Sequence, residues 1–549
     1  MTTSTPSPRP SRVTTIFAVA VLVAGPPLNY LRYHHYPLLA PEVLLPAGLW
    51  LLCSIVIGSG LNRAPRPVRM VAFTMLLLLF ADLQFNWHHA PVVVLAILAI
   101  AVGVWLLERH LETILALALA AFYLAALPST SRTRASSTQF ANIAPDTLLP
   151  PVVYLILDEH IGIEGWPKEF GVTREMERRV RAFYLDEGFR LFGKAYSEFV
   201  NTDASIPAVL NWPVEEPHGI TAELIPLHRY RPLSNELFRK LSAEGYRIRV
   251  YESTYMDFCD PKAYTVQSCE IQPANSIRNL SLHDDLSLWR RALLVGLYFL
   301  EAKSQVYARA RDAYSAFAAS RPAWPRWSAR IEHSEFPAAM QLLDRLQRDI
   351  RTDDPRGTLY FAHLLAPHNP YEVDSTCRSQ TDPNLWLEIQ GTNTSAERAL
   401  RYDLYAAQVR CLYRHLDALF RVVDSLPNGR RMVIIVHGDH GSRIVFHYPT
   451  AGSIPILVPS DFTDGFSALF AIRAPGIPAG YDRRFVPINE LVGRALASRF
   501  ASMDVPTLER HVLRIENGFH SPFVAVDLSD TSLAPARRED GTSRRATLP

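Results

Sequence analysis

Two carboxylates and an imidazole directly follow an apolar run in the segment 151–160, PVVYLILDEH. Residues 152–157 are mostly apolar and rich in β-formers, which predicts a buried central strand of a parallel sheet. Ligand sites of open α/β sheets lie just past the carboxyl ends of such strands. Asp158, Glu159 and His160 therefore stand where a metal or catalytic site is expected, although they could equally cap the next helix.

A second group of ligand-type residues follows another predicted strand. Residues 431–436, with MVIIV at the core, lead into the sequence HGDHG, which contains Asp439 and His440. These two side chains are a hard and a borderline ligand adjacent in the chain, and the flanking glycines let the backbone turn tightly around an ion. This is the most specific chemical signal in the sequence.

A third strand end carries histidines. Residues 358–365, TLYFAHLL, have the buried-strand pattern and are followed by APHNPY, so His363 and His368 lie at or after the strand end. Alternation of such strands with predicted helices, for example at 173–187 and 396–425, indicates a mostly parallel α/β sheet. Three strand ends then deliver ligand-type residues to one edge, and this convergence predicts a metal site.

A candidate nucleophile lies at a predicted helix start in the segment 195–212, AYSEFVNTDASIPAVLNW. Asn201, Thr202 and Ser205 are N-cap residue types, and a proline falls in the first turn. A hydroxyl at a helix N-terminus meets free backbone N–H groups and the positive end of the helix dipole, so an oxygen nucleophile and a phosphate could share this site. The alternative is that Thr202 or Ser205 only caps the helix.

Composition separates the chain into two parts. The chain has 549 residues, 48% of them hydrophobic, and a net charge of +2. That length predicts more than one domain, and the near-zero charge gives no case for a nucleic-acid partner. Nearly all long apolar runs lie before residue 128, and the rest has an ordinary soluble composition.

The first part is predicted to be a five-helix transmembrane domain at 1–128, because five segments approach the length that crosses a bilayer: 13–31, 37–60, 69–86, 90–108 and 110–128. Arginines before the first segment and between alternate segments place the N-terminus in the cytoplasm. Five spans then put the rest of the chain outside. We expect a linker at 129–150, an exported catalytic domain at 151–525 and a disordered tail at 526–549.

Two further features belong to the exported part. Its four cysteines are an even number in a disulfide-permissive compartment, and we predict the pairs Cys259–Cys269 and Cys377–Cys411 among three possible connectivities. Residues 286–319 form a predicted helical region whose apolar centre, 293–300, is too short to span. It is either a buried core helix, which we favour, or an amphipathic helix on the outer leaflet.

Together these features resemble the membrane-bound phosphoethanolamine and phosphoglycerol transferases, a group with lipoteichoic acid synthase-like proteins within the alkaline phosphatase and sulfatase superfamily. The resemblance covers residues 13 to 500. It implies that Asp158 is a metal ligand, with Glu159 as a second acidic ligand. It implies that Thr202, three residues before Ser205-Ile206-Pro207, is the nucleophile.

The same resemblance implies that Asp439 and His440 complete the metal site together with Thr202. His368 would hold the substrate phosphate or act in catalysis, and His447 would contribute to substrate binding. Zinc is the implied metal, with manganese as the alternative, because Asp-His stands where calcium sulfatases have Asp-Asn. The arginine of the sulfatase motif is missing after Pro207, which counts against a true sulfatase.

The implied activity is transfer of a phospholipid headgroup phosphate ester, phosphoethanolamine or phosphoglycerol, to an envelope glycan or lipid acceptor. A phospho-threonine would be the intermediate, and the protein would sit in the bacterial inner membrane with its catalytic domain in the periplasm. No cysteines flank Thr202, unlike in the phosphoethanolamine transferases, so the headgroup stays open. The alternatives are a phosphodiesterase or sulfatase-type hydrolase and, in a different class, a non-catalytic binding protein with a structural metal.

Overall fold

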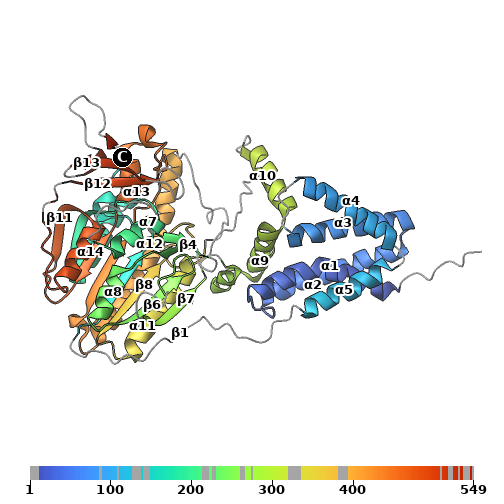
Figure 1. Ribbon diagram of the computed structural model, residues 1–549, viewed down its shortest axis with the longest axis horizontal. Helices are drawn as coiled ribbons and strands as arrows, with labels where there is room; N and C mark the ends of the chain where they lie inside the picture. The colour runs from blue at the N-terminus through green and yellow to red at the C-terminus, as the bar shows by residue number, and fades with distance from the viewer. Residues whose placement is uncertain are drawn as a thin grey trace, which may run out of the picture. The chain divides into compact units, whose positions relative to one another are not determined.

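The chain forms two compact units in a computed structural model (Figure 1). The helical unit contains Met1–Arg132, Ser276–His333 and Thr381–Leu387, and the α/β unit contains Thr133–Asn275, Ser334–Gln380 and Glu388–Pro549. The structure describes residues 11–85, 90–107, 110–125, 138–139, 149–212, 222–225, 230–259, 266–273, 276–319, 335–380, 394–506, 508, 510–516, 523–529, 532–535 and 545–546. Most of the expected linker at 129–150 lies outside these residues.

Five helices form at the five predicted apolar segments: α1 (Arg12–Tyr33), α2 (Pro41–Arg63), α3 (Arg66–Phe85), α4 (Ala90–Leu107) and α5 (Leu111–Ala125). Of the described helices, α1, α2 and α3 are long and apolar enough to cross a membrane singly. Helix α5 has only 15 residues, and it meets α4 at a bend of 111°. The described residues therefore give three spans, or four if the bent pair is one span, and five separate spans are not confirmed.

The helical unit also contains a segment from the middle of the chain. Its elements are η2 (Ile277–Leu282), α9 (Leu288–Lys303) and α10 (Gln305–Ala319). The single helical region expected at 286–319 is broken at Ser304. Helix α9 buries one face in the core of the helical unit, not in that of the α/β unit, and exposes Trp289 and Leu293 on its other side. The α/β unit is therefore interrupted in sequence by Ser276–His333, which the expected 151–525 domain did not separate.

The α/β unit is built on a nine-stranded sheet in the order β1-β7-β6-β8-β2-β9-β10-β3-β11. The five strands from β7 to β9 are parallel, and β10 is antiparallel to both of its neighbours. The strands are β1 (Thr138–Gln139), β2 (Val152–Leu157), β3 (Arg190–Tyr196), β6 (Arg247–Ser253), β7 (Val266–Gln272), β8 (Thr358–Leu364), β9 (Val433–Gly438), β10 (Phe470–Arg473) and β11 (Gly480–Pro487). This is the mostly parallel sheet that the sequence predicts.

Helices cover both faces of this sheet, because its central strands are apolar on both sides. In β2, Val153, Leu155 and Leu157 face one core, and the alternate residues face the other. The first core contains α6 (Gly171–Asp186), α11 (Phe336–Thr352) and α12 (Ser395–Ser425), and the second contains α7 (Thr202–Leu210), α8 (Glu236–Ala243) and α14 (Ile488–Ala497). Helix α12 starts with a capping box between Thr394 and Glu397.

A small antiparallel sheet follows near the C-terminus, with β12 (Val512–Glu516), β13 (Phe523–Ser529), β14 (Ser532–Pro535) and β15 (Arg545–Ala546). Leu513, Ile515 and Val526 pack there on Phe462 and Phe466 of α13 (Pro459–Phe466). The expected start of a disordered tail, at residue 526, thus falls inside β13. The remaining short elements are η1 (Ile163–Gly165), β4 (Ala222–Leu224), β5 (Tyr230–Pro232), η4 (Gly429–Arg431) and η5 (Ile454–Ile456).

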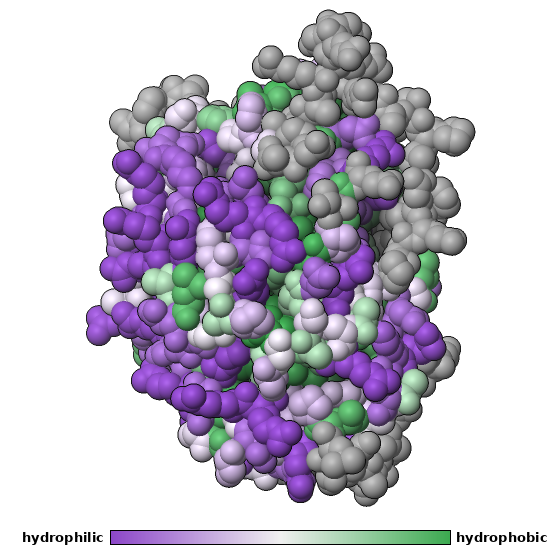
Figure 2. Space-filling view, turned by 90° about the vertical axis from the view of Figure 1, so that its left-hand side faces the viewer, coloured by the Kyte–Doolittle hydropathy of each residue, from purple (hydrophilic) through white to green (hydrophobic). Residues whose placement is uncertain are grey.

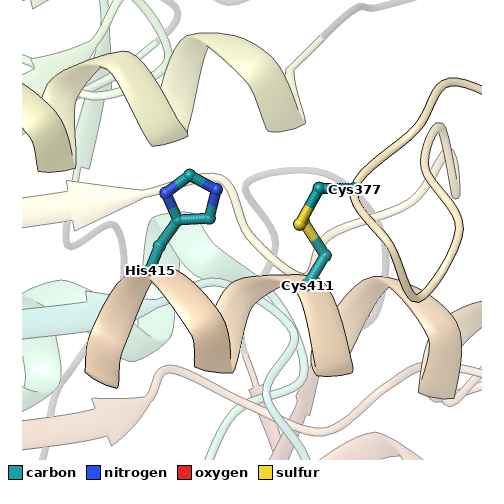
Figure 3. Close-up of side chains that lie close together, drawn as sticks. All are labelled: Cys377, Cys411 and His415. Carbon is teal, nitrogen blue, oxygen red and sulfur yellow. A yellow bond between two sulfur atoms is a disulfide. The ribbon is translucent and has the colours of Figure 1, made fainter. Parts of the chain in front are cut away.

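The α/β unit carries both expected disulfides, Cys259–Cys269 and Cys377–Cys411. The second joins a loop to α12, where His415 lies one turn beyond Cys411 and points to the same side (Figure 3). The paired sulfurs offer no thiolate to a metal at this point. The face of the unit seen in Figure 2 is largely hydrophilic, with apolar residues scattered among polar ones, as on a water-exposed surface.

Candidate active site

Adjacent parallel strands place Asp158 and Asp439 side by side. Strand β2 lies between β8 and β9, and Leu157 is in register with Leu364 on one side and Gly438 on the other. Asp158 directly follows the last residue of β2, and Asp439 directly follows the last residue of β9. Their adjacency follows from the strand order, because parallel strands in register end at the same edge of the sheet.

Asp158, Asp439 and His440 form a buried group of metal-competent atoms, all within 4.8 Å of one another. His440 Nε2 lies 3.2 Å from Asp439 Oδ2 and 3.8 Å from Asp158 Oδ1. His440 Nδ1 lies 2.9 Å from the Gly441 carbonyl oxygen. Because that oxygen can only accept, Nδ1 carries the proton and Nε2 keeps its lone pair for a metal.

The carboxylates of this group fit a bound cation. Asp158 Oδ1 and Asp439 Oδ2 are buried, and neither accepts a hydrogen bond from any residue that the structure describes. Buried carboxylate oxygens without donors are costly unless a cation neutralises them. Two carboxylates and one imidazole are ligands that suit zinc or manganese, so the donor set agrees with the metal implied by the sequence.

Without a bound cation, the pKa values of Asp158 and Asp439 shift in opposite directions. Burial raises the pKa of Asp439 above its usual range, and the charge of Asp158 raises it further. Burial also opposes ionisation of Asp158, but the charges of His368 and His363 and a hydrogen bond from His363 outweigh it and lower the pKa of Asp158. One carboxylate thus favours the protonated form and the other the ionised form, as expected for two carboxylates that share a site.

Thr202 reaches the same group from another direction. Strand β3 runs parallel to β9, because β10 between them is antiparallel to both, so β3 ends at the same edge and leads into α7. Thr202 Oγ1 lies 3.2 Å from His440 Nε2 and 3.5 Å from Asp158 Oδ2. The N-cap residue is Asn201, whose side chain binds Tyr448 and Glu516 instead of capping the helix. The Thr202 hydroxyl therefore faces the candidate ligands at the start of a helix.

The structure does not group Glu159 with these ligands. Glu159 has a φ of +63°, and its carboxylate turns to Asn369 and Arg443: the Asn369 backbone N–H donates to Oε2 at 3.0 Å and Arg443 Nε donates to Oε1 at 2.6 Å. Burial raises the pKa of Glu159, but the charges of Arg443, His368 and His440 together outweigh it, so the net pKa is lowered. Here the second acid forms a buried ion pair.

His368 lies beside this ion pair. Its Nε2 is 3.5 Å from Glu159 Oε1 and 3.0 Å from Arg443 Nη2, and its Nδ1 is 3.1 Å from Glu335 Oε2. Burial lowers the pKa of His368, but the surrounding carboxylates, led by Glu159, raise it well above its ordinary value. Arg443 and His368 thus lie together beside the Glu159 carboxylate. The sequence around Arg443 carries little signal for this role beyond its position three residues after His440.

Two other histidines occupy different places. His363, in β8, is fully buried, and its Nε2 lies 3.3 Å from Asp158 Oδ2. The strand pattern of 358–365 predicts its position near a strand end but no role for it. His447 is partly exposed, and its Nδ1 lies 3.2 Å from Asp461 Oδ2. The structure pairs His447 with Asp461 rather than with any of the candidate metal ligands.

Helix α12 holds the loop that carries Asp158 and Glu159. Tyr405 Oη donates to the Glu159 carbonyl oxygen at 2.8 Å and accepts from the Ile161 backbone N–H at 3.0 Å. Tyr413 Oη lies 3.0 Å from His160 Nε2. His160 is thus occupied by the protein itself, and the tyrosines fix the turn after β2. The periodicity of the helix predicts α12 but not these contacts.

No family model matches the chain, and no curated protein matches it. Solved structures similar to it include the phosphonate monoester hydrolase of Agrobacterium radiobacter, with 13% identity over 69% of this chain and 86% of the other and a TM-score of 0.41. Another is the C-terminal periplasmic domain of EptC from Escherichia coli in complex with zinc (13%, 71% and 96%, TM-score 0.36). A third is a protein in the alkaline phosphatase superfamily from Vibrio parahaemolyticus (14%, 76% and 88%, TM-score 0.36).

Sulfatases are also among the similar solved structures. Their identities with this chain are 14% or less, and the TM-scores lie below 0.5. Such distant similarity transfers no activity, so the functional argument rests on the site.

Proposed function

We propose that the chain is a metal-dependent, sulfatase-like transferase that moves a phospholipid headgroup phosphate ester, phosphoethanolamine or phosphoglycerol, through a phospho-threonine intermediate. One observation carries the proposal. The Thr202 hydroxyl, at the start of α7, lies within 3.5 Å of both His440 and Asp158 in a buried group with Asp439. A hydroxyl beside metal-competent carboxylates and free helix N–H groups suits attack on a phosphate ester.

The chemistry divides among the chain's own residues. Asp158, Asp439 and His440 would hold the divalent metal, zinc or manganese, which supplies positive charge that favours ionisation of the Thr202 hydroxyl. The Thr202 hydroxyl gives up its proton as Oγ1 attacks phosphorus in line, and the phosphate ester stays on Thr202. The bond from phosphorus to the diacylglycerol oxygen breaks, and that oxygen takes up a proton as diacylglycerol leaves. The backbone N–H groups at the start of α7, together with Arg443 and His368, bind the phosphoryl oxygens.

The second half of the reaction uses an acceptor hydroxyl from an envelope glycan or lipid. This hydroxyl attacks the phospho-threonine, the bond to Oγ1 breaks, and Thr202 recovers its proton. His368 is the candidate acid and base, since it lies at the Glu159–Arg443 pair. His447 remains a proposed substrate contact only if the acceptor reaches it, because its near partner is Asp461.

The proposed location is the extracytoplasmic side of the inner membrane. The apolar helices of the helical unit support a membrane protein, and two disulfides in the α/β unit favour an oxidising compartment. A membrane location also provides the lipid donor and accepts the diacylglycerol product.

Intact mass spectrometry of the full chain tests this proposal. The detergent-purified protein, loaded with zinc or manganese, is incubated with phosphatidylethanolamine or phosphatidylglycerol and no acceptor. We expect a mass gain on Thr202 that equals one headgroup phosphate ester, and no gain in Thr202→Ala, which should keep its metal content.

Other results would change the proposal. An unmodified mass with steady release of phosphate or sulfate from small soluble esters would replace the transferase by a hydrolase. Retained turnover in Thr202→Ala would remove Thr202 as the nucleophile. Absence of both adduct and release, with all candidate donors and acceptors present, would favour the non-catalytic class.

A further inference from the structure

The inserted segment packs against one end of the long apolar helices. Its residues Leu294, Val295, Tyr298 and Phe299 share a buried cluster with Tyr30 near the C-terminus of α1, Val43 near the N-terminus of α2 and Leu83 near the C-terminus of α3. Figure 1 shows α9 and α10 beside these helices in the helical unit. Because α1 and α3 end where α2 begins, all three contacts lie at the same end of the candidate spans.

Polar contacts fix the insertion at this end. Asp82, in the last turn of α3, accepts hydrogen bonds from Ser304 Oγ at 2.6 Å and from the Gln305 backbone N–H at 3.2 Å, so it caps the N-terminus of α10. Arg291 of α9 lies 3.9 Å from Glu42, which is buried in the first turn of α2. The insertion is therefore part of the helical unit and not a loose loop.

The outward faces of α9 and α10 are apolar. Trp289 and Leu293, one turn apart on α9, are 68% and 50% exposed. Val306 and Phe317, three turns apart on α10, are 63% and 42% exposed. Water-soluble domains rarely expose large apolar side chains in such groups, and these lie on helices whose other faces are already buried.

The neighbouring surface of the spans indicates what covers these faces. Leu39, before α2, and Leu44, in its first turn, are 84% and 53% exposed at the same end. Exposed leucines at the end of an apolar helix are typical of a lipid-facing surface, and α9 packs at this same end. Tryptophan and arginine are typical of the boundary between acyl chains and headgroups, and Trp289, Arg290 and Arg309 are on these two helices.

We propose that α9 and α10 form an interfacial membrane surface, in which Trp289, Leu293, Val306 and Phe317 enter the headgroup–acyl boundary of the phospholipid leaflet at that end of the spans. An amphipathic helix pair that is held at the span ends meets the bilayer at a fixed depth. The insertion thus gives the chain a lipid contact besides its spans. The inference rests on the membrane assignment of the helical unit and is independent of the transferase chemistry.

Depth measurement in phospholipid nanodiscs tests this surface in the full chain. Cys53, the free cysteine among the described residues, is first replaced by Ala, and a nitroxide is then attached to Leu293→Cys or, separately, to Val306→Cys. Ala302→Cys is the matched control, because Ala302 is exposed on the side of α9 opposite Leu293. Intact disulfides and an unchanged thermal midpoint show that each labelled variant is folded.

Power saturation distinguishes the environments of the labels. We expect the labels at 293 and 306 to collide with oxygen more than with a water-soluble nickel chelate, and the label at 302 to show the reverse. Equal chelate access at 293, 306 and 302 would overturn the proposal, because the surface would be in water. Exclusion of both reagents at 293 and 306 would also overturn it, because a protein surface would then cover these helices.

Discussion

Replacement of Arg443 by Met separates the structural role of this residue from its proposed phosphate binding. The Glu159 carboxylate is fully buried, and Arg443 is its cationic partner. Removal of one partner of a buried ion pair costs about 3–5 kcal/mol, and here the hydrogen bonds from Asn369 and the nearby His368 offset only part of the remaining Glu159 charge. At about 2–4 °C per kcal/mol, Arg443→Met should lower the thermal midpoint by roughly 10 °C.

The double variant Glu159→Gln/Arg443→Met removes both charges and keeps groups of similar size. We expect it to regain most of the lost stability, since replacing both partners leaves no uncompensated charge. Headgroup transfer should stay about 100-fold or more below that of the unmodified chain, the usual effect of losing one donor to a phosphoryl or oxyanion oxygen. Thermal unfolding of the detergent-solubilised chain and initial rates of diacylglycerol release measure the two effects.

Two results would refute this reasoning. A midpoint within about 2 °C of the unmodified value for Arg443→Met would show that Glu159 does not depend on Arg443. Full activity in the double variant would show that Arg443 holds Glu159 in place but does not bind the phosphate.

Three further predictions concern the metal, the pH dependence and the disulfides. Asp439→Asn should lose most bound zinc or manganese in elemental analysis, whereas Thr202→Ala should keep it; equal metal content in both would remove Asp439 from the ligand set. Burial and, secondarily, the charge of Asp203 raise the pKa of Glu516 to about 7. The contribution of Glu516 to the stability of the fold is therefore fully present below the usual pKa of a glutamate and is lost as the pH rises through about 7. Glu516→Gln should then gain about 1 kcal/mol at pH 8, after allowance for solvent screening, and little at pH 5, and a pH-independent effect would contradict the assignment. Loss of the Cys377–Cys411 disulfide by double Ser substitution should cost about 4 kcal/mol of unfolding free energy, measured by denaturant titration, because the bond closes a long loop; no change would show that the loop is held by other contacts.

Local patterns in the sequence were enough to predict the main elements. The apolar runs predict the helices of the helical unit and the strands β2, β8 and β9, because burial of each segment depends on its own side chains. The positions of Asp158 and Asp439 directly after such strands predict their convergence at one edge of a parallel sheet. The cysteine pairs also follow from few possibilities, since four residues allow only three connectivities.

Contacts between distant segments were decided only by the tertiary structure. Strand order places Asp158 between β8 and Asp439, and the antiparallel β10 brings β3 and Thr202 to the same edge. Glu159 turns away from Asp158 because its backbone takes a positive φ and its carboxylate finds Arg443, a partner 284 residues away. The hydrophobic pattern of a segment indicates which of its side chains can be buried. Which other segment it packs against depends on the folding of the whole chain. For that reason the sequence by itself determined the main apolar helices and central strands and which residues end those strands, and only the fold decided which side chains meet.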